Sequence, residues 1–249
     1  MTMALISRWG GLAAKTQHGF GVVQMQLENE QGEVVPYRLD NFLPRFGATA
    51  NDDGGLPSLK NFFFAKLYFK DDVADKWWRD ANLGTGEIPG GGDWPMVDFW
   101  RAAAPFSVPI APAIKYKLRF GGTPTPTSYL AAVRGRYPER FFFGDAGQNN
   151  RKAMLNVSHA FKDGGRWQFR IWGWLPEQNS EGLNREQLMR QLQQLVTSDT
   201  TFWRSIFNAD VMDFSRSEWR ELNTGHTRNT PVPTLNPDSC ANFLRALLS

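Results

Sequence analysis

The fold follows most directly from residues 152–174, which read Lys152-Ala-Met-Leu-Asn-Val-Ser-His-Ala-Phe-Lys-Asp-Gly-Gly-Arg-Trp-Gln-Phe-Arg-Ile-Trp-Gly-Trp174. We predict strands over Lys152–Phe161 and Arg166–Trp174, because β-branched and aromatic side chains recur in both runs. Between them, Lys162-Asp-Gly-Gly165 supplies the glycines that a tight turn needs. These residues therefore predict a β-hairpin.

Two further elements flank this hairpin. Upstream, Asn61–Lys70 is aromatic and alternates in character, as in a strand at the centre of a sheet. Downstream, Asn184–Val196 is the clearest helix, because Asn184 can cap it with Gln187 three residues on. An apolar stripe that should pack on a sheet is formed by Leu188, Leu192, Leu195 and Val196. Strands and helices are interleaved, which predicts an α+β domain with an antiparallel sheet and packed helices.

Shorter elements are predicted around this framework. Residues 1–28 read as a helix end, a glycine loop and a strand, and residues 29–57 read as a turn-rich connector. Short helices are expected over Val73–Ala81 and Cys240–Leu248. Ile114–Phe120 alternates in the manner of a strand with one basic face, since residues at period two share a side.

Composition narrows the class of protein. With 249 residues, 41% hydrophobic and 21% charged, the chain is typical of a globular protein that can bury a core. The single cysteine, Cys240, excludes an intrachain disulfide and a zinc site built on several thiolates. We find neither an apolar run long enough to span a bilayer nor a basic signal sequence, so we expect a cytoplasmic protein with no membrane contact.

Basic residues are concentrated in one part of the chain. Between Ala113 and Trp174 there are 11 Lys/Arg and three acids, a net charge of +8, whereas the whole chain carries +3. Such an excess is typical of a polyanion contact, although a solvated strand face would also produce it. The residues predicted here to contact RNA are Lys115, Lys117, Arg119, Arg134, Arg136, Arg140, Arg151 and Lys152.

Aromatic side chains lie among these cations. Tyr129, Tyr137 and Phe141–Phe143 could stack unpaired bases. The alternative is burial, because three consecutive phenylalanines usually place at least two in a core. Trp172 and Trp174 share one face of their strand and are likewise expected in the core more than on a stacking surface.

A glycine-rich loop near the start of the chain is a second candidate RNA contact. It lies between Arg8 and Val23. Glycines let a backbone approach a ligand closely, and a lysine between them suits a phosphate backbone. The loop residues predicted to contact RNA are Gly10, Gly11, Lys15, Thr16, His18, Gly19 and Gly21.

Motifs for catalysis or metal binding are not recognised. The three histidines have no partners at metal-ligand spacing, and no nucleophile motif appears, so neither a metal nor a cofactor is expected. His18 could act as a general base on a ribose 2′-OH, but the sequence supplies no second titrating group for it. We therefore expect His18 to contact a phosphate or base, or to be polar loop surface.

The chain resembles the RAMP superfamily, the RNA-binding subunits of CRISPR effector complexes. Arg8–Gly21 resembles the glycine-rich loop of that family. Three further stretches, Arg140–Gly144, Arg151–Ser158 and Trp167–Pro176, resemble the later domain of the type III-B (Cmr) subunit at the crRNA 3′ end. The resemblance covers about 100 of the 249 residues.

This resemblance implies a ferredoxin-like, RRM-related α+β fold. It also implies binding of guide and target RNA among other RAMP subunits, with backbone cleavage by a different subunit. The family loop comes late in a first domain, whereas here it opens the chain, and Ala13 replaces a common glycine. We therefore expect residues 1–57 to be the remnant of a first RAMP domain and 58–249 a second RAMP-like domain, in a fragment or a split subunit.

Three functions remain open from the sequence. The leading hypothesis is a non-catalytic RNA-binding subunit of a CRISPR ribonucleoprotein in antiviral defence. The second is a metal-independent RNA-processing endoribonuclease that uses His18. The third is an assembly module whose exposed aromatics contact proteins.

Overall fold

The computed structural model describes residues 27–35, 62–71, 107–108, 110–121, 128–144, 153–174, 182–207 and 209–221. Its strands are β1 (Leu27–Glu28), β2 (Val34–Val35), β3 (Phe62–Phe69), β4 (Ser107–Val108), β5 (Leu155–Val157), β6 (Ala160–Asp163), β7 (Arg166–Trp174) and β8 (Met212–Glu221). Its helices are α4 (Ala111–Phe120), the 3₁₀-helix η5 (Ala131–Val133), α5 (Arg136–Phe143), α6 (Arg185–Ser198) and α7 (Thr200–Phe207). The α+β class predicted from the sequence is confirmed.

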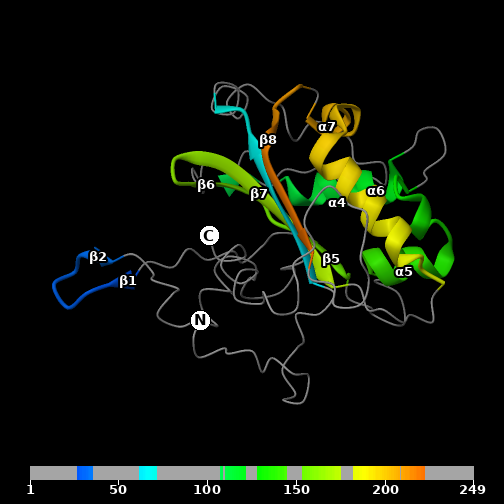
Figure 1. The fold of residues 1–249 in the computed structure, drawn as a ribbon, viewed down its shortest axis with the longest axis horizontal. Coiled ribbons are helices and arrows are strands. Elements are labelled where there is room, and N and C mark those ends of the chain that lie inside the picture. Colours follow the sequence, from blue (N-terminus) through cyan, green and yellow to red (C-terminus); the bar gives the residue numbers. More distant parts are fainter. Residues whose placement is uncertain are drawn as a thin grey trace, which may run out of the picture.

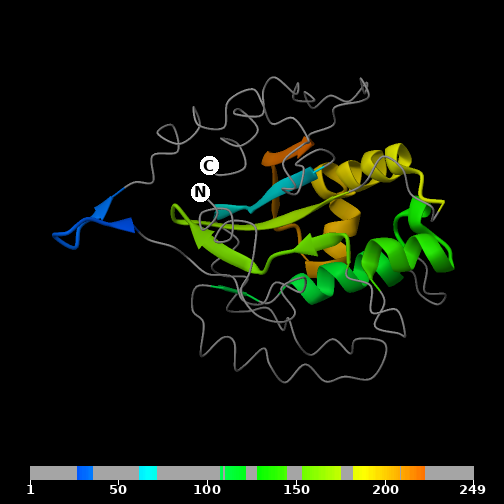
Figure 2. The same ribbon diagram turned by 90° about the horizontal axis from the view of Figure 1, so that it is seen from below.

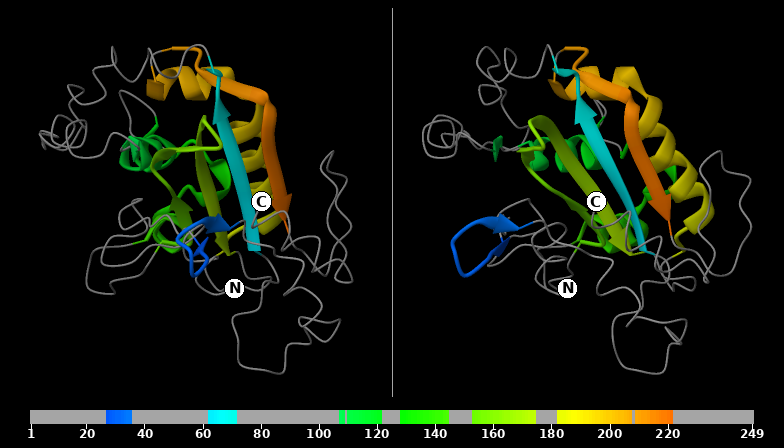
Figure 3. Two further views of the ribbon diagram at one scale, coloured as in Figure 1. Left: turned by 90° about the vertical axis from the view of Figure 1, so that its left-hand side faces the viewer. Right: turned by 60° about the vertical axis from the view of Figure 1, so that its left-hand side comes forward.

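Six strands form one antiparallel sheet in the order β4-β6-β7-β3-β8, and β5 also pairs with β7. Helices α4, α6 and α7 lie on one face of this sheet (Figures 1 and 3). Along the chain, strand β3 is followed by the short strand β4 and by helices α4, η5 and α5, then by the β5/β6–β7 hairpin, then by helices α6 and α7 and strand β8. All of these elements fall within residues 58–249, and the division into two domains stays a prediction.

Strand β3 is at the centre of the sheet, as predicted, with β7 and β8 as its neighbours. Alternate side chains point to opposite faces of a strand. Phe63, Ala65, Leu67 and Phe69 face the helices and belong to the main core. Phe62 and Phe64, on the other face, are also at most 2% exposed. Burial on both faces explains why this strand is a nearly continuous aromatic and aliphatic run.

The predicted hairpin is confirmed, but its first strand is divided. Gly164 and Gly165 adopt φ of 57° and 82°, as a two-residue hairpin turn requires. The strand predicted over Lys152–Phe161 consists of β5 and β6, which both pair with β7. Between them, the Ser158 hydroxyl accepts a hydrogen bond from the backbone N–H of Arg170 at 2.8 Å. A side chain thus replaces a backbone partner where the strand is interrupted.

Helix α6 begins as predicted. The Asn184 side chain accepts a hydrogen bond from the backbone N–H of Gln187 at 2.9 Å, which satisfies one of the unpaired donors of the first turn. The predicted stripe is buried, with Leu188, Leu192 and Val196 fully so. The helix continues two residues beyond the predicted end, to Ser198.

The strand predicted over Ile114–Phe120 is wrong, because these residues belong to helix α4. Proline in the first turn of this helix costs no hydrogen bond, since the N–H groups there have no partner within the helix. The backbone N–H of Ala111 instead donates to Nδ1 of His159 at 3.5 Å. The basic face inferred from period two therefore does not exist.

Helix α7 and strand β8 were not predicted. Asp199 starts α7, since its carboxylate accepts a hydrogen bond from the backbone N–H of Phe202 at 2.8 Å. The helix then buries Phe202, Trp203 and Phe207 against the sheet. Strand β8 returns the chain beside β3.

Strands β1 and β2 form a separate hairpin, which Figure 2 shows away from the six-stranded sheet. Asn29 organises its turn, because its side-chain oxygen accepts from the N–H groups of Gln31 and Glu33 at 3.0 and 2.8 Å. Of the strand predicted over Val23–Leu27, only Leu27 is described. The helices predicted over Val73–Ala81 and Cys240–Leu248 lie outside the described residues.

Candidate nucleic-acid interface

Helix α4 has two distinct faces. Its inner stripe comprises Ala111, Ile114, Lys115 and Leu118, all at most 7% exposed. Its outer stripe comprises Ala113, Tyr116, Lys117 and Phe120, which share a face at spacing i, i+3, i+4, i+7. Ala113 is exposed and the other three are half-buried. The side of the helix away from the core therefore carries two aromatic rings and a lysine.

The segment that contains α4, η5 and α5 is strongly basic. Residues 111–144 hold six basic side chains and one acid, for a net charge of +5, namely Lys115, Lys117, Arg119, Arg134, Arg136 and Arg140 against Glu139. Glu139 is the partner of Arg119, with Nε and Oε1 2.7 Å apart. One ion pair between α4 and α5 thus uses the only acid of the segment.

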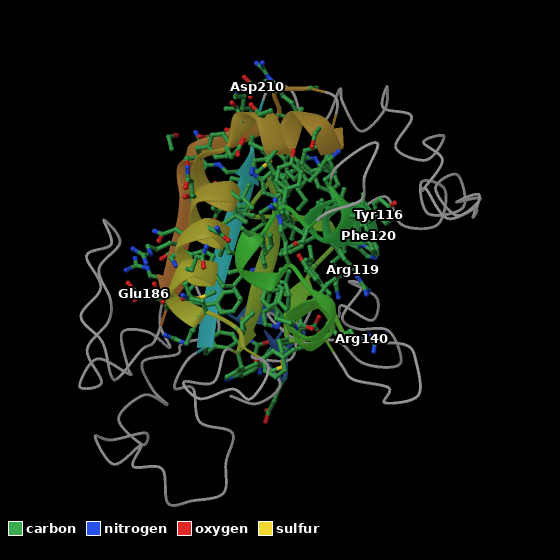
Figure 4. All side chains as sticks on the ribbon, turned by 90° about the vertical axis from the view of Figure 1, so that its right-hand side faces the viewer. Tyr116, Arg119, Phe120, Arg140, Glu186 and Asp210 are labelled. Carbon is green, nitrogen blue, oxygen red and sulfur yellow. The ribbon has the colours of Figure 1, made fainter. Side chains whose placement is uncertain are left out.

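Arg119 also lies against an aromatic ring. Its guanidinium carbon is 4.9 Å from the centroid of Phe120, and the rings of Phe120 and Tyr116 are 5.0 Å apart. Figure 4 shows Tyr116, Arg119, Phe120 and Arg140 on the same side of the molecule, with Glu186 of helix α6 on the opposite side. We call Tyr116, Lys117, Arg119, Phe120 and Arg140 the α4–α5 surface.

Arg134 lies just before α5, where it is exposed and its Nε donates to the backbone oxygen of Ser128 at 3.1 Å. Arg136 begins α5, and only its backbone is described. Of the predicted loop and strand contacts, Gly10, Gly11, Lys15, Thr16, His18, Gly19, Gly21, Arg151 and Lys152 lie outside the described residues. Those nine stay predictions.

Lys115 does not lie with Lys117 and Arg119 on a common basic face. Residues of an α-helix are about 100° apart, so Lys115 points inward and Lys117 outward. Lys115 is 7% exposed, and its burial lowers the pKa of the ammonium from 10.5 to about 8, with a further contribution from the nearby Arg119 charge. A side chain so placed contributes to packing and not to a surface contact.

Replacing Lys115 by methionine is expected to stabilise the protein at pH 7 by about 1–3 kcal/mol, since each pKa unit corresponds to about 1.4 kcal/mol. With a pKa lowered to about 8, the folded state binds fewer protons than the unfolded state between pH 8 and 10.5. Wild-type stability therefore rises with pH across that window. Urea denaturation of both proteins at pH 7 and pH 10 measures this effect. The difference in unfolding free energy between Lys115→Met and the wild type should be smaller at pH 10. An equal difference at both pH values would contradict the lowered pKa of Lys115.

Three other cations of the +8 segment lie on the β6–β7 hairpin, and Arg170 is the buried one among them. Arg170 is 2% exposed. Its guanidinium lies 3.7 Å from the Asp163 carboxylate and 4.8 Å from the ring of Phe161. Arg166 lies 4.0 Å from Asp71. The outward-facing cations of the segment among the described residues are therefore those of α4, α5 and the turn before α5, together with Lys162 and Arg166 of the β6–β7 hairpin.

Most of the aromatic residues considered for base stacking lie in the hydrophobic core. Phe142 and Phe143 are 0% and 7% exposed, and Phe141 packs partly buried against the core. Trp172 is buried, whereas Trp174 at the end of β7 is 36% exposed. The burial expected for two of the three phenylalanines and for Trp172 is confirmed, and the burial expected for Trp174 is wrong.

Tyr116 and Phe120 were missed by the sequence reasoning as candidate stacking residues. Their separation of four residues, on the face opposite to Ile114 and Leu118, is the signal that identifies them. Reading the segment as a strand hid this signal, because period two places all four side chains on one face.

Comparison of the chain with protein-family models, curated proteins and solved structures found no match. In the described part of the chain, no three His, Cys, Asp or Glu side chains converge as metal ligands. The helices described here are all too short or too polar to cross a lipid bilayer.

Proposed function

We propose that this chain is a non-catalytic RNA-binding subunit of a CRISPR ribonucleoprotein effector. Within it, the chain contacts guide and target RNA near the crRNA 3′ end, beside other RAMP subunits. The observation that supports this function best is the charge of the segment 111–144, where one acid, itself paired with Arg119, opposes five cations besides the buried Lys115. Cations on such a surface neutralise phosphates and release counterions, which drives binding regardless of sequence.

The topology supports the RAMP assignment. A strand, helix, strand, strand, helix, strand order is the ferredoxin-like arrangement that RAMP and RRM proteins share. Here β3, α4, the β5/β6–β7 hairpin, α6–α7 and β8 follow that order, with the two-residue edge strand β4 added between β3 and α4, and β3 and β7 are the central strands. A ferredoxin-like RAMP fold is therefore the assignment we propose for residues 58–249.

Charge reversal on the α4–α5 surface is expected to weaken RNA binding. In Lys117→Glu/Arg140→Glu, loss of about two phosphate contacts should lower the salt slope of log K by about 1.4 for a single strand. We expect affinity for a generic RNA to fall by about tenfold or more at low salt. Fluorescence anisotropy over a salt series measures both quantities.

The matched control is Arg190→Glu, which reverses an exposed arginine of α6. Arg190 lies 3.4 Å from Glu186, which Figure 4 places on the opposite side of the molecule. The control should bind RNA like the wild type. Equal affinity and salt slope for the wild type and the double variant, with unchanged melting temperatures, would refute the assignment of this surface.

A further inference from the structure

We propose that Tyr116 and Phe120 stack on unpaired bases, so that the α4–α5 surface prefers single-stranded RNA to duplex RNA. This inference rests on the proposed function, because it names the form of RNA that the surface takes. It assigns a role to Tyr116 and Phe120, two residues that phosphate binding alone would not require.

The position of the rings is the first argument. Helix α4 fills the core with Ala111, Ile114 and Leu118, which are 0% exposed. Tyr116 and Phe120 lie on its other face and are half-buried. The outer face of a helix is normally polar, and here cations border the rings on the same side of the molecule. An aromatic pair among cations combines the two groups that single-strand binding proteins use.

The packing of the planar groups is the second argument. The Tyr116 and Phe120 rings are 5.0 Å apart and inclined at 46°, and the Arg119 guanidinium lies 4.9 Å from the Phe120 ring centroid. The 2.7 Å contact with Glu139 fixes that guanidinium. Arginine planes and aromatic rings both accept bases by stacking. Glu139 thus holds the Arg119 guanidinium beside the Phe120 ring.

The form of the RNA follows from which surfaces each ligand offers. A duplex presents phosphates, but its base faces are covered by neighbouring pairs, and its deep major groove is closed to side chains. Lys117 and Arg140 can contact the phosphates of either form. Only an unpaired strand offers base faces to Tyr116 and Phe120. The cations therefore supply affinity for both forms, and the rings supply the preference.

The test compares the wild type with Tyr116→Leu/Phe120→Leu. Leucine keeps apolar volume and helix propensity but removes the aromatic faces. Binding to a 12-nucleotide single strand and to a 12-base-pair duplex is measured by anisotropy at fixed salt. We expect affinity for the single strand to fall by about tenfold or more, and affinity for the duplex to stay within twofold.

A second variant keeps the test independent of folding. Tyr116→Phe retains the ring and should bind the single strand like the wild type. If the leucine variant melts like the wild type and binds the single strand equally well, the stacking proposal is wrong while RNA binding stands. If the wild type binds neither RNA at low salt, the proposed function itself fails. If Tyr116→Leu/Phe120→Leu loses a protein partner but binds both RNAs like the wild type, the stacking proposal is also wrong.

Discussion

Gly173→Ala is expected to destabilise the protein strongly. A Cβ at this position would lie 2.3 Å from the backbone oxygen of Met154 and 3.0 Å from the ring of Phe63. Gly173 sits in β7 between Leu155 of β5 and Phe63 of β3. A backbone oxygen cannot rotate away as a side chain can, so relief of the clash requires the strands to separate. We expect a loss of about 3–5 kcal/mol, at the upper end of single substitutions.

Thermal and urea unfolding followed by circular dichroism measure this loss. Gly164→Asn is the matched control, because Gly164 has nothing within 4 Å of the added Cβ. Its φ of 57° is in the left-handed region that Asn tolerates in hairpin turns. The control should stay within about 1 kcal/mol of the wild type. Melting of Gly173→Ala within two or three degrees of the wild type would contradict the geometry of this close approach.

Trp203→Ala should destabilise the protein by about 3–5 kcal/mol, as large aromatic truncations in a core do. Trp203 is 1% exposed and connects helix α7 to the sheet. Its ring lies 5.7 Å from Phe207 in a stacked arrangement and 5.3 Å from Phe169 edge to face. Its Nε1–H donates to the backbone oxygen of Val196 at 3.3 Å. Truncation removes all of these contacts and leaves a cavity between α7 and β7.

Arg204→Ala, the next residue of α7, is the control. Arg204 is 61% exposed and 3.6 Å from Asp210, and an exposed pair of this kind contributes about 0–1 kcal/mol. The two variants are compared by their midpoints of urea denaturation, provided that the dependence of unfolding free energy on urea is the same for both. Equal midpoints for Trp203→Ala and Arg204→Ala would show that α7 does not hold the sheet.

The sequence alone predicts correctly those elements in which all local signals favour the same secondary structure. The glycine turn at Gly164 and Gly165, the cap at Asn184 and the aromatic run of β3 each have a local cause that tertiary packing did not override. The hairpin, helix α6 and the central strand were predicted for these reasons. Together they were enough for the α+β class.

The prediction was poorer where the spacing of apolar residues fits both a strand and a helix. In Ile114–Phe120, apolar side chains recur at every second residue, but Ile114 and Leu118 also fit a helix that begins at Ala111. Seven residues are too few to separate these periods. Pro112 lies in the first turn of this helix, where proline is tolerated.

Strand β8 was missed for a different reason. Its register with β3 shifts between Lys66 and Tyr68. Met212 and Trp219 both belong to the main core, although they are an odd number of residues apart. A bulge changes which residues of a strand face the core, so no regular alternation in the sequence marks β8.

The ion pair of Arg119 with Glu139 could not be predicted either, because it depends on the packing of helix α4 on helix α5.

The order in which the strands are made has a consequence for synthesis on the ribosome. Lys66 of β3 pairs with Arg170 of β7 and Glu218 of β8. At the usual elongation rate the ribosome needs about 5–20 s to add the hundred residues that separate β3 from β7, and longer for β8. During that delay the Phe-Phe-Phe run of β3 leaves the exit tunnel without either neighbour. Apolar segments of high β-propensity aggregate when exposed in this way, so we expect β3 to be prone to aggregation in the nascent chain.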